Sequence, residues 1–427
     1  MADLADRDME KSRDTAVQKR DRQIDILFFC LLLSFVSLIT LYLFARQTTG
    51  SEALYHSDMK AYILEMQGLD SGYSFPYPVF FKLSAFLHLF TGPEFAVALA
   101  TMLLNSLGMV VMKLMLNRLA LPEVNRAFRQ SGHLRNRTWL AGVALSILAV
   151  SLFFISMLYL PKGMLLPGMR FKYLGVFTAN PFHNATYMAA RPFAILAFFW
   201  YVRLLDCYEK ESGNSRADYI LFSLFLLLAT MTKPSFTIVL VGTAGLIMVY
   251  RLFRSGFRNF IPTLRLGLCF LPTFLDLLYQ FQGVFVPDKG TEGGIGFCFG
   301  EVWGLYCKNF PAAILLGIGF PVLVLALNFK ELGKNTVYRF SWQIYLMSFA
   351  MAFLLYEKGF RKPDFNFSWG YMYGIFFSFV GALLVLLRAT AAKKKPLLLV
   401  VQWLGYLAHV VCGLYYFYGI LRGNMYY

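Results

Sequence analysis

Residues 24–45 read IDILFFCLLLSFVSLITLYLFA, an apolar run that is long enough to cross a membrane as a helix. Residues 1–23 before it are mostly polar and charged, with neither an apolar segment nor a small-residue cleavage site. We therefore expect an uncleaved anchor instead of a signal peptide. Because Lys and Arg near a span stay on the cytosolic side, residues 1–23 are predicted to form a basic cytosolic tail.

The whole chain has the composition of a polytopic membrane protein. Its 427 residues are 58% hydrophobic and only 15% charged, which is far from the composition of a soluble domain. The net charge of +16 does not indicate nucleic-acid binding, because the basic residues cluster beside the ends of apolar runs. We expect an all-α fold with a single transmembrane domain over residues 24–427.

The apolar runs predict about eleven membrane crossings. With the basic N-terminal tail in the cytosol, an odd number of crossings puts the C-terminus outside. Most of the 40 Lys and Arg then lie in the inner loops and the tail. A bacterial plasma membrane is the expected location. The predicted spans are 24–45, 94–116, 138–160, 188–206, 217–232, 235–253, 262–280, 310–328, 341–356, 371–389 and 397–420.

Residues 46–93 form the first external loop in this arrangement, and two short helices are expected there. Residues 55–68 read YHSDMKAYILEMQG, with apolar side chains at helical spacing and Ser57 as the predicted N-cap. Residues 79–90 are apolar but too short to cross, so both helices are expected to lie at the membrane surface. Asp58 on the first of them is either a proton acceptor or a residue that supports the first helical turn.

Three later segments also place polar residues on the outer side. His183, Asn184, Tyr187 and Arg191 precede or begin the span at 188–206, although Arg191 is equally well explained as a contact to lipid headgroups. Lys233 occupies a tight turn between two spans, where it either pairs with a lipid phosphate or anchors the turn at the interface.

The last polar segment, residues 356–371, combines charged, amide and aromatic side chains, a mixture that is typical of sugar-binding pockets. Glu357, Arg361, Asn366 and Trp369 are the candidates, although Trp is also common at membrane interfaces. Asn184-Ala-Thr and Asn366-Phe-Ser match N-glycosylation acceptors, but we interpret both as pocket residues. Cys298 and Cys307 fall in one external loop, as a disulfide or as two thiols.

Together these segments resemble the GT-C class of integral-membrane glycosyltransferases, which includes protein mannosyltransferases and the aminoarabinose transferase of lipid A. The resemblance covers most of the chain and depends on the order of several short motifs. These are an acid heading Asp58-x-x-x-Tyr62 and closing with Gly68, then Pro76-Tyr-Pro-Val-Phe-Phe, Phe90-Thr-Gly92 and Thr232-Lys233-Pro234.

The resemblance implies an inverting transfer of a sugar from a polyprenyl-phosphate donor to a glycan, lipid or protein hydroxyl on the external face. Asp58 would be the catalytic base, and the donor phosphate would be held by Lys233 with Arg170, Arg191 or Arg361. Met59 replaces the second acid of many members, so a divalent metal stays an open question. The remaining substrate-binding candidates are His56, Tyr62, His183, Asn184, Tyr187, Glu357, Asn366 and Trp369.

Two other functions remain open at this point. A transporter or flippase for a lipid-linked sugar should carry charged or helix-breaking residues at mid-membrane in paired halves. Lys113 and Asp276 are nearly the only charges that could lie deep, and both are near span ends. A membrane O-acyltransferase usually needs a histidine base, for which His88, His183 and His409 are present. The absence of a glycine-rich phosphate loop favours a lipid-linked donor over a nucleotide sugar.

Overall fold

The computed structural model describes residues 2–130, 137–158, 174–210, 214–284 and 294–423, and within them the protein is all-α apart from two short strands. This confirms the predicted fold class. The helices of the first part are α1 (Ala2–Thr49), α2 (Met59–Met66), α3 (Pro78–His88), α4 (Pro93–Gln130), α5 (Trp139–Ser151), η2 (Leu174–Phe177), α6 (Ala185–Cys207), α7 (Arg216–Thr232) and α8 (Ser235–Arg254).

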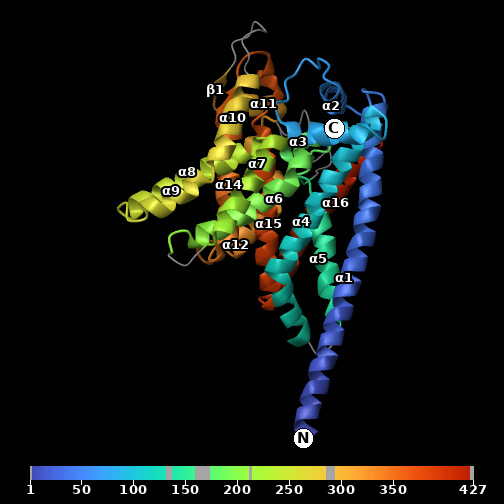
Figure 1. Ribbon diagram of the computed structural model, residues 1–427, viewed down its shortest axis with the longest axis vertical. Helices are drawn as coiled ribbons and strands as arrows, with labels where there is room; N and C mark the ends of the chain where they lie inside the picture. Colours follow the sequence, from blue (N-terminus) through green and yellow to red (C-terminus); the bar gives the residue numbers. More distant parts are fainter. Residues whose placement is uncertain (1, 131–136, 159–173, 211–213, 285–293, 424–427) are drawn as a thin grey trace.

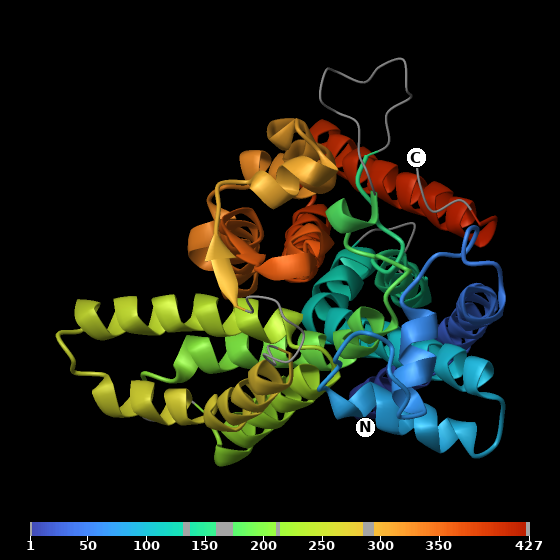
Figure 2. The ribbon, with the colours of Figure 1, turned by 90° about the horizontal axis from the view of Figure 1, so that it is seen from above.

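The second part continues with two helices that follow each other across a bend and ends with two long helices. These elements are α9 (Phe260–Leu268), α10 (Leu271–Val284), β1 (Ile295–Phe297), α11 (Glu301–Tyr306), α12 (Phe310–Leu327), α13 (Glu331–Lys334), α14 (Thr336–Leu354), β2 (Leu355–Glu357), η4 (Gly359–Asp364), α15 (Ser368–Ala391) and α16 (Pro396–Leu421). The two chain ends lie at opposite ends of the molecule, and α7 to α10 form a lobe on one side (Figures 1 and 2).

Seven described helices are long and apolar enough to cross a membrane, or eight if α9 and α10, which meet at 48°, form one broken span. These helices establish a membrane protein, but the predicted number of about eleven crossings is not confirmed. The predicted spans at 138–160 and 217–232 correspond to α5 and α7, of only 13 and 17 residues. The span predicted at 341–356 lies in α14 as far as Leu354 and ends in β2, and the Arg, Gln, Ser and Tyr side chains of α14 lower its hydropathy.

Helix α15 forms the centre of the bundle, and its most apolar stretch is entirely buried. It packs against α14 along a seam of small residues that repeat every seven positions. A Cβ atom added to Gly374 would lie 1.9 Å from Ser348 Oγ, and one added to Gly381 would lie 2.2 Å from Ser341 Oγ. The two backbones therefore approach closely, as small residues permit in membrane helices.

The first loop contains the two predicted short helices at the end of the molecule that also holds the C-terminal end of α16 (Figure 1). Helix α3 begins at Pro78, a residue suited to the first helical turn. It lies across the bundle axis, and Leu89 and Phe90 just beyond it are about three-quarters exposed, as expected at a membrane surface. Helix α2 begins at Met59 with Asp58 as N-cap, so the prediction of Ser57 was wrong by one residue.

A small antiparallel pair of strands, β1 and β2, was not expected from the sequence. Ile295 pairs with Glu357 and Phe297 pairs with Leu355, so this pairing joins the segment before α11 to the segment after α14. Three-residue strands are too short to show an alternating pattern. Nearby, Cys298 and Cys307 both remain thiols.

A buried ion pair attaches α1 to its neighbours. Lys113 Nζ of α4 donates hydrogen bonds to Asp25 Oδ1 (2.7 Å) and to the Gly142 carbonyl oxygen of α5 (2.8 Å). Ser146 Oγ donates to the same Asp25 oxygen at 3.0 Å. Only 3% of Lys113 and 8% of Asp25 are exposed. The pair thus links three helices whose sequence positions are far apart.

We expect Lys113→Met to lower the free energy of unfolding by about 3–5 kcal/mol, because it leaves the Asp25 carboxylate buried without its cation. Asp25→Asn combined with Lys113→Met should recover part of this loss. Thermal unfolding of the purified protein in detergent measures both effects, with Arg118→Gln, an exposed change on the same helix, as the control. Equal melting temperatures for Lys113→Met and the control would contradict the assigned role.

Candidate functional site

Four segments that are far apart in the sequence meet at the α2–α3 end of the bundle. They are the residue before α2, the start of α6, the turn between α7 and α8, and the segment from β2 to the start of α15. Asp58, Asn184, Lys233 and Trp369 come from these four segments in turn. The sequence analysis selected residues from each of them, and the structure joins these residues into one polar cluster.

Asp58 is held by α6 and does not support its own helix through its side chain. Although Asp58 is the N-cap of α2, it makes no side-chain capping bond. Its Oδ2 atom instead accepts hydrogen bonds from Asn184 Nδ2 (2.5 Å) and Tyr62 Oη (3.4 Å), and its backbone N–H donates to the His183 carbonyl oxygen (3.1 Å). Among the described residues both side-chain donors act on Oδ2, so the other carboxylate oxygen is available to a substrate.

Asn184 orients the carboxylate and starts α6 at the same time. Its Oδ1 atom accepts a hydrogen bond from the Tyr187 backbone N–H at 2.8 Å, which is the usual N-cap bond. Its Nδ2 atom donates to Tyr62 Oη at 2.7 Å as well as to Asp58. Only 2% of Asn184 is exposed. This burial agrees with a pocket residue and leaves no room for an attached glycan.

Lys233 ends α7, where Pro234 prevents the helix from continuing. Only 6% of Lys233 is exposed, and its Nζ atom donates a hydrogen bond to Thr186 Oγ1 at 3.3 Å. Nζ also lies over the rings of Trp369 (4.8 Å) and Tyr77 (5.8 Å). Burial lowers the pKa of Lys233 to about 8, while the negative charge of Asp58 opposes that shift.

Thr186 connects the acid to the cation, although the sequence analysis did not select it. Its Oγ1 atom is 3.1 Å from Tyr62 Oη and 3.3 Å from Lys233 Nζ. Tyr62 in turn contacts Asp58, so a continuous chain of hydrogen bonds runs from Asp58 through Tyr62 and Thr186 to Lys233. In the sequence, Thr186 was noticed only as the third residue of a glycosylation pattern.

The segment from β2 to α15 adds a second charged group beside this chain. Glu357 Oε2 lies 3.1 Å from Arg361 Nε and accepts a hydrogen bond from Asn366 Nδ2 at 2.8 Å. Asn366 Oδ1 accepts a bond from Trp369 Nε1 at 3.2 Å. Because the Trp369 ring also contacts Lys233, this segment and the Asp58 chain form one site.

Aromatic rings surround Trp369 and make it a wall of the site. The rings of His183 and Tyr187 lie 5.2 Å and 5.8 Å from it, measured between centroids. Burial lowers the pKa of His183 to about 4, so this imidazole is neutral at pH 7. These contacts and the contact to Lys233 occupy much of the Trp369 ring, which makes it a support for Lys233 as well as a candidate for sugar stacking.

Three of the predicted residues do not join this cluster. Arg191 is fully buried deeper in the bundle, where its two Nη atoms donate to Asn180 and Asn105 and its guanidinium covers the Phe153 ring at 4.7 Å. Direct phosphate binding by Arg191 is therefore not supported by its position. His56 is exposed and lies 3.9 Å from Glu52, and Arg170 falls outside the described residues.

Metal ligands do not gather at the cluster. Across residues 2–130, 137–158, 174–210, 214–284 and 294–423, no three His, Cys, Asp or Glu side chains are close enough together to hold a metal ion. The described groups provide a hydrogen-bonded carboxylate, a buried amine and an Arg–Glu pair. These groups suit proton transfer and the binding of an anion.

We expect Thr186→Val to lower the free energy of unfolding by about 1.5–3 kcal/mol, because it removes a hydrogen bond to the charged Lys233 without changing the shape of the side chain much. Thr186→Ser keeps the hydroxyl and should retain most of this stability. Thermal unfolding of the two purified variants in detergent provides the comparison. Similar losses in both variants would show that packing of the methyl group, not the hydroxyl, is what matters.

Comparisons of the chain with protein-family models, with curated proteins and with solved structures found no match.

Proposed function

We propose that this protein is a membrane glycosyltransferase that moves a sugar from a polyprenyl-phosphate donor to an acceptor hydroxyl. The observation that carries the proposal is the hydrogen-bonded chain from the Asp58 carboxylate through Tyr62 and Thr186 to the buried amine of Lys233. A transfer of this kind needs a base for the acceptor and a cation for the leaving phosphate. Asp58 is a candidate for the base and Lys233 for the cation, and the hydrogen bonds of Tyr62 and Thr186 connect the two.

In the proposed reaction, the acceptor oxygen attacks the anomeric carbon of the sugar and forms the new glycosidic bond. The bond between that carbon and the phosphate oxygen breaks, and the polyprenyl phosphate leaves with the electron pair. Asp58 takes the proton of the acceptor hydroxyl through the oxygen that is not bonded to Asn184 and Tyr62. Attack from the face opposite the phosphate inverts the configuration.

The phosphate is assigned to Lys233 and Arg361 in this proposal. Lys233 is fixed by Thr186 and the Trp369 ring, and Arg361 is fixed by Glu357, so both cations are oriented before the donor binds. Preoriented cations stabilise the negative charge that develops on a leaving phosphate. Arg191 contributes from beneath the site by supporting Tyr187, whose ring it approaches to 5.7 Å.

We assign the Asp58 cluster to the external side of the membrane and the basic tail to the cytosol. The positive-inside distribution of Lys and Arg supports this orientation. The position of the two chain ends at opposite ends of the bundle agrees with an odd number of crossings (Figure 1). Eleven crossings remain the proposal if the shorter α5, α7 and α14 also cross.

Reconstitution tests the activity directly. The purified protein is placed in vesicles with a set of polyprenyl-phosphate sugars, and mass spectrometry follows loss of the sugar from each donor. We expect at least one donor to release polyprenyl phosphate in the presence of a mixed acceptor extract. Movement of intact donor between leaflets without release of the sugar would identify a flippase instead.

The pKa of Lys233 makes a further prediction. Because burial lowers this pKa to about 8, the amine is charged below pH 8 and loses its charge as the pH rises through that value. We expect kcat/KM to fall on the alkaline side with a midpoint near pH 8. In Lys233→Arg the guanidinium stays charged, so this fall should disappear. Identical alkaline profiles in the two proteins would remove Lys233 as its cause.

A further inference from the structure

A second polar site lies at the opposite ends of the helices that begin at the Asp58 cluster. Helix α6 starts at Ala185 and α8 starts at Ser235, both beside the cluster. With 23 and 20 residues they extend about 34 Å and 30 Å, which is the thickness of the hydrocarbon core of a bilayer. Their far ends are therefore about 30 Å from the cluster along the helix axes.

These far ends line an open cleft of about 470 Å³. The cleft is lined by Leu205, Asp206, Glu209, Arg251, Arg254 and Ser255. Four of these six side chains are charged, two negatively and two positively. In the topology proposed above, α6 and α8 cross the membrane, which assigns the cleft to the cytosolic end of these two spans.

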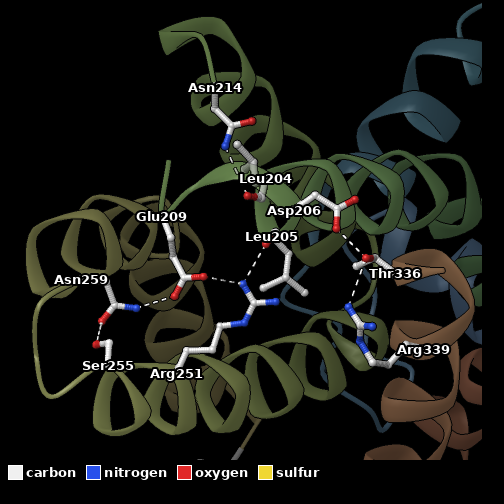
Figure 3. A network of polar contacts seen from close by, with 10 residues as sticks. All are labelled: Leu204, Leu205, Asp206, Glu209, Asn214, Arg251, Ser255, Asn259, Thr336 and Arg339. Atoms are coloured by element: carbon white, nitrogen blue, oxygen red, sulfur yellow. Dashed lines mark hydrogen bonds and ion pairs between the residues drawn. The ribbon is translucent and has the colours of Figure 1, made fainter. Parts of the chain in front are cut away.

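Two bonds hold Arg251 in a fixed orientation. Its Nη1 atom donates to the Leu205 carbonyl oxygen at 2.9 Å and lies 3.2 Å from Glu209 Oε2. Glu209 is itself fixed, since its Oε1 atom accepts a bond from Asn259 Nδ2 at 2.5 Å (Figure 3). The guanidinium is therefore positioned before any ligand arrives, which lowers the entropy lost on binding.

The other two charged residues that line the cleft, Asp206 and Arg254, have polar atoms that are available to a ligand. Asp206 accepts a hydrogen bond from Thr336 through Oδ1, so its second oxygen is available to a cation. Arg254 is exposed and makes no hydrogen bond or ion pair with any of the residues that the structure describes. Tyr250 and Phe253, on the same last turns of α8, are 62% and 66% exposed and suit contact with acyl chains.

We infer that this cleft binds the headgroup of a phospholipid that carries both a phosphate and a primary amine, as in phosphatidylethanolamine. The phosphate contacts Arg251 and Arg254, and the ammonium group contacts the second carboxylate oxygen of Asp206. Arginine binds phosphate through charge-assisted hydrogen bonds, and carboxylates pair in the same way with an ammonium group. This assignment does not depend on the reaction at the Asp58 cluster.

Native mass spectrometry of the detergent-purified protein tests the assignment. The protein is titrated with phosphatidylethanolamine, phosphatidylcholine and phosphatidylglycerol of equal acyl chains. We expect phosphatidylethanolamine to be retained about tenfold more strongly, because a choline group cannot donate hydrogen bonds and a glycerol group carries no charge. Equal retention of the three lipids would overturn the assignment.

Two variants locate the binding. Arg254→Gln, which removes an exposed cation, and Asp206→Asn, which keeps an oxygen for Thr336, should each lower retention of phosphatidylethanolamine about tenfold. Arg265→Gln removes an exposed charge on the same lobe outside the cleft and should have no effect. An equal loss in Arg265→Gln would show general attraction to the basic surface and would contradict a specific site.

The source of the phosphate is distinguished by competition. Soluble phosphoethanolamine and inorganic phosphate are added at concentrations up to the millimolar range while the bound lipid is counted. We expect the lipid to remain bound, because the exposed aromatic side chains on α8 add acyl-chain contacts that neither soluble compound provides. Complete displacement by either compound at the concentration of the lipid would assign the cleft to a soluble phosphate ligand instead.

Discussion

Asp58→Asn is expected to lower the rate of sugar transfer by a factor of about 10² to 10⁴, the range that a general base contributes. The substitution keeps the size of the side chain and an oxygen that can accept the Asn184 hydrogen bond, but it removes the ability to take a proton. Donor binding should be preserved, because the phosphate is assigned to other residues. Single-turnover assays with saturating donor separate the chemical step from binding.

Glu52→Gln is the matched control for this substitution. Glu52 lies in the same loop and is also a carboxylate, but it is exposed and pairs only with His56 and Lys60 in the described part of the chain. We expect nearly unchanged activity from it. If Asp58→Asn turned over donor at close to the normal rate, Asp58 would have no part in the chemistry.

Lys233→Met should reduce kcat/KM by a factor of about 10² to 10³, the usual cost of removing one group that stabilises charge in a transition state. Methionine fills the space of the lysine stem between Trp369 and Tyr77, so packing is largely kept. Because the phosphate is bound in both the ground state and the transition state, KM for the donor should rise as kcat falls. Steady-state kinetics over a donor series measures the two parameters.

Lys82→Met provides the comparison for Lys233→Met. Lys82 is an exposed cation on α3, at the same end of the molecule but outside the hydrogen-bonded chain. Its loss should leave both kinetic parameters within about twofold of normal, as for most exposed substitutions. A normal KM for the donor in Lys233→Met would show that Lys233 does not bind the phosphate. That role would then be assigned to Arg361, and Arg361→Gln would be the next variant to test.

The all-α fold could be predicted because apolar runs of more than about 18 residues leave little alternative to membrane helices. The number of crossings could not, because hydropathy alone does not decide whether α5 or α14 spans the bilayer. The Asp25–Lys113 pair was also missed, since the two residues are 88 positions apart. An acid at the start of one span and a lysine near the end of another show no local pattern.

For the site, the sequence identified the side chains with distinctive chemistry and missed those whose importance depends on contacts. Asp58 and Lys233 were selected because charged side chains at or within the membrane are costly and are usually paired or functional. Thr186 has no such signal, because threonine is frequent in helices of membrane proteins and only its neighbours make it a bridge. Arg191 is the opposite case. It was selected for its charge, but its guanidinium donates hydrogen bonds to Asn105 and Asn180 inside the bundle.

The seam between α14 and α15 restricts sliding of these two helices past each other. Gly374 and Gly381 fit against Ser348 and Ser341 in one register, and a shift by a single residue would bring larger side chains into the spaces that only hydrogen atoms fit. Helix α15 carries Trp369 in its first turn. The close packing of α15 against α14 therefore keeps one wall of the site in a fixed position.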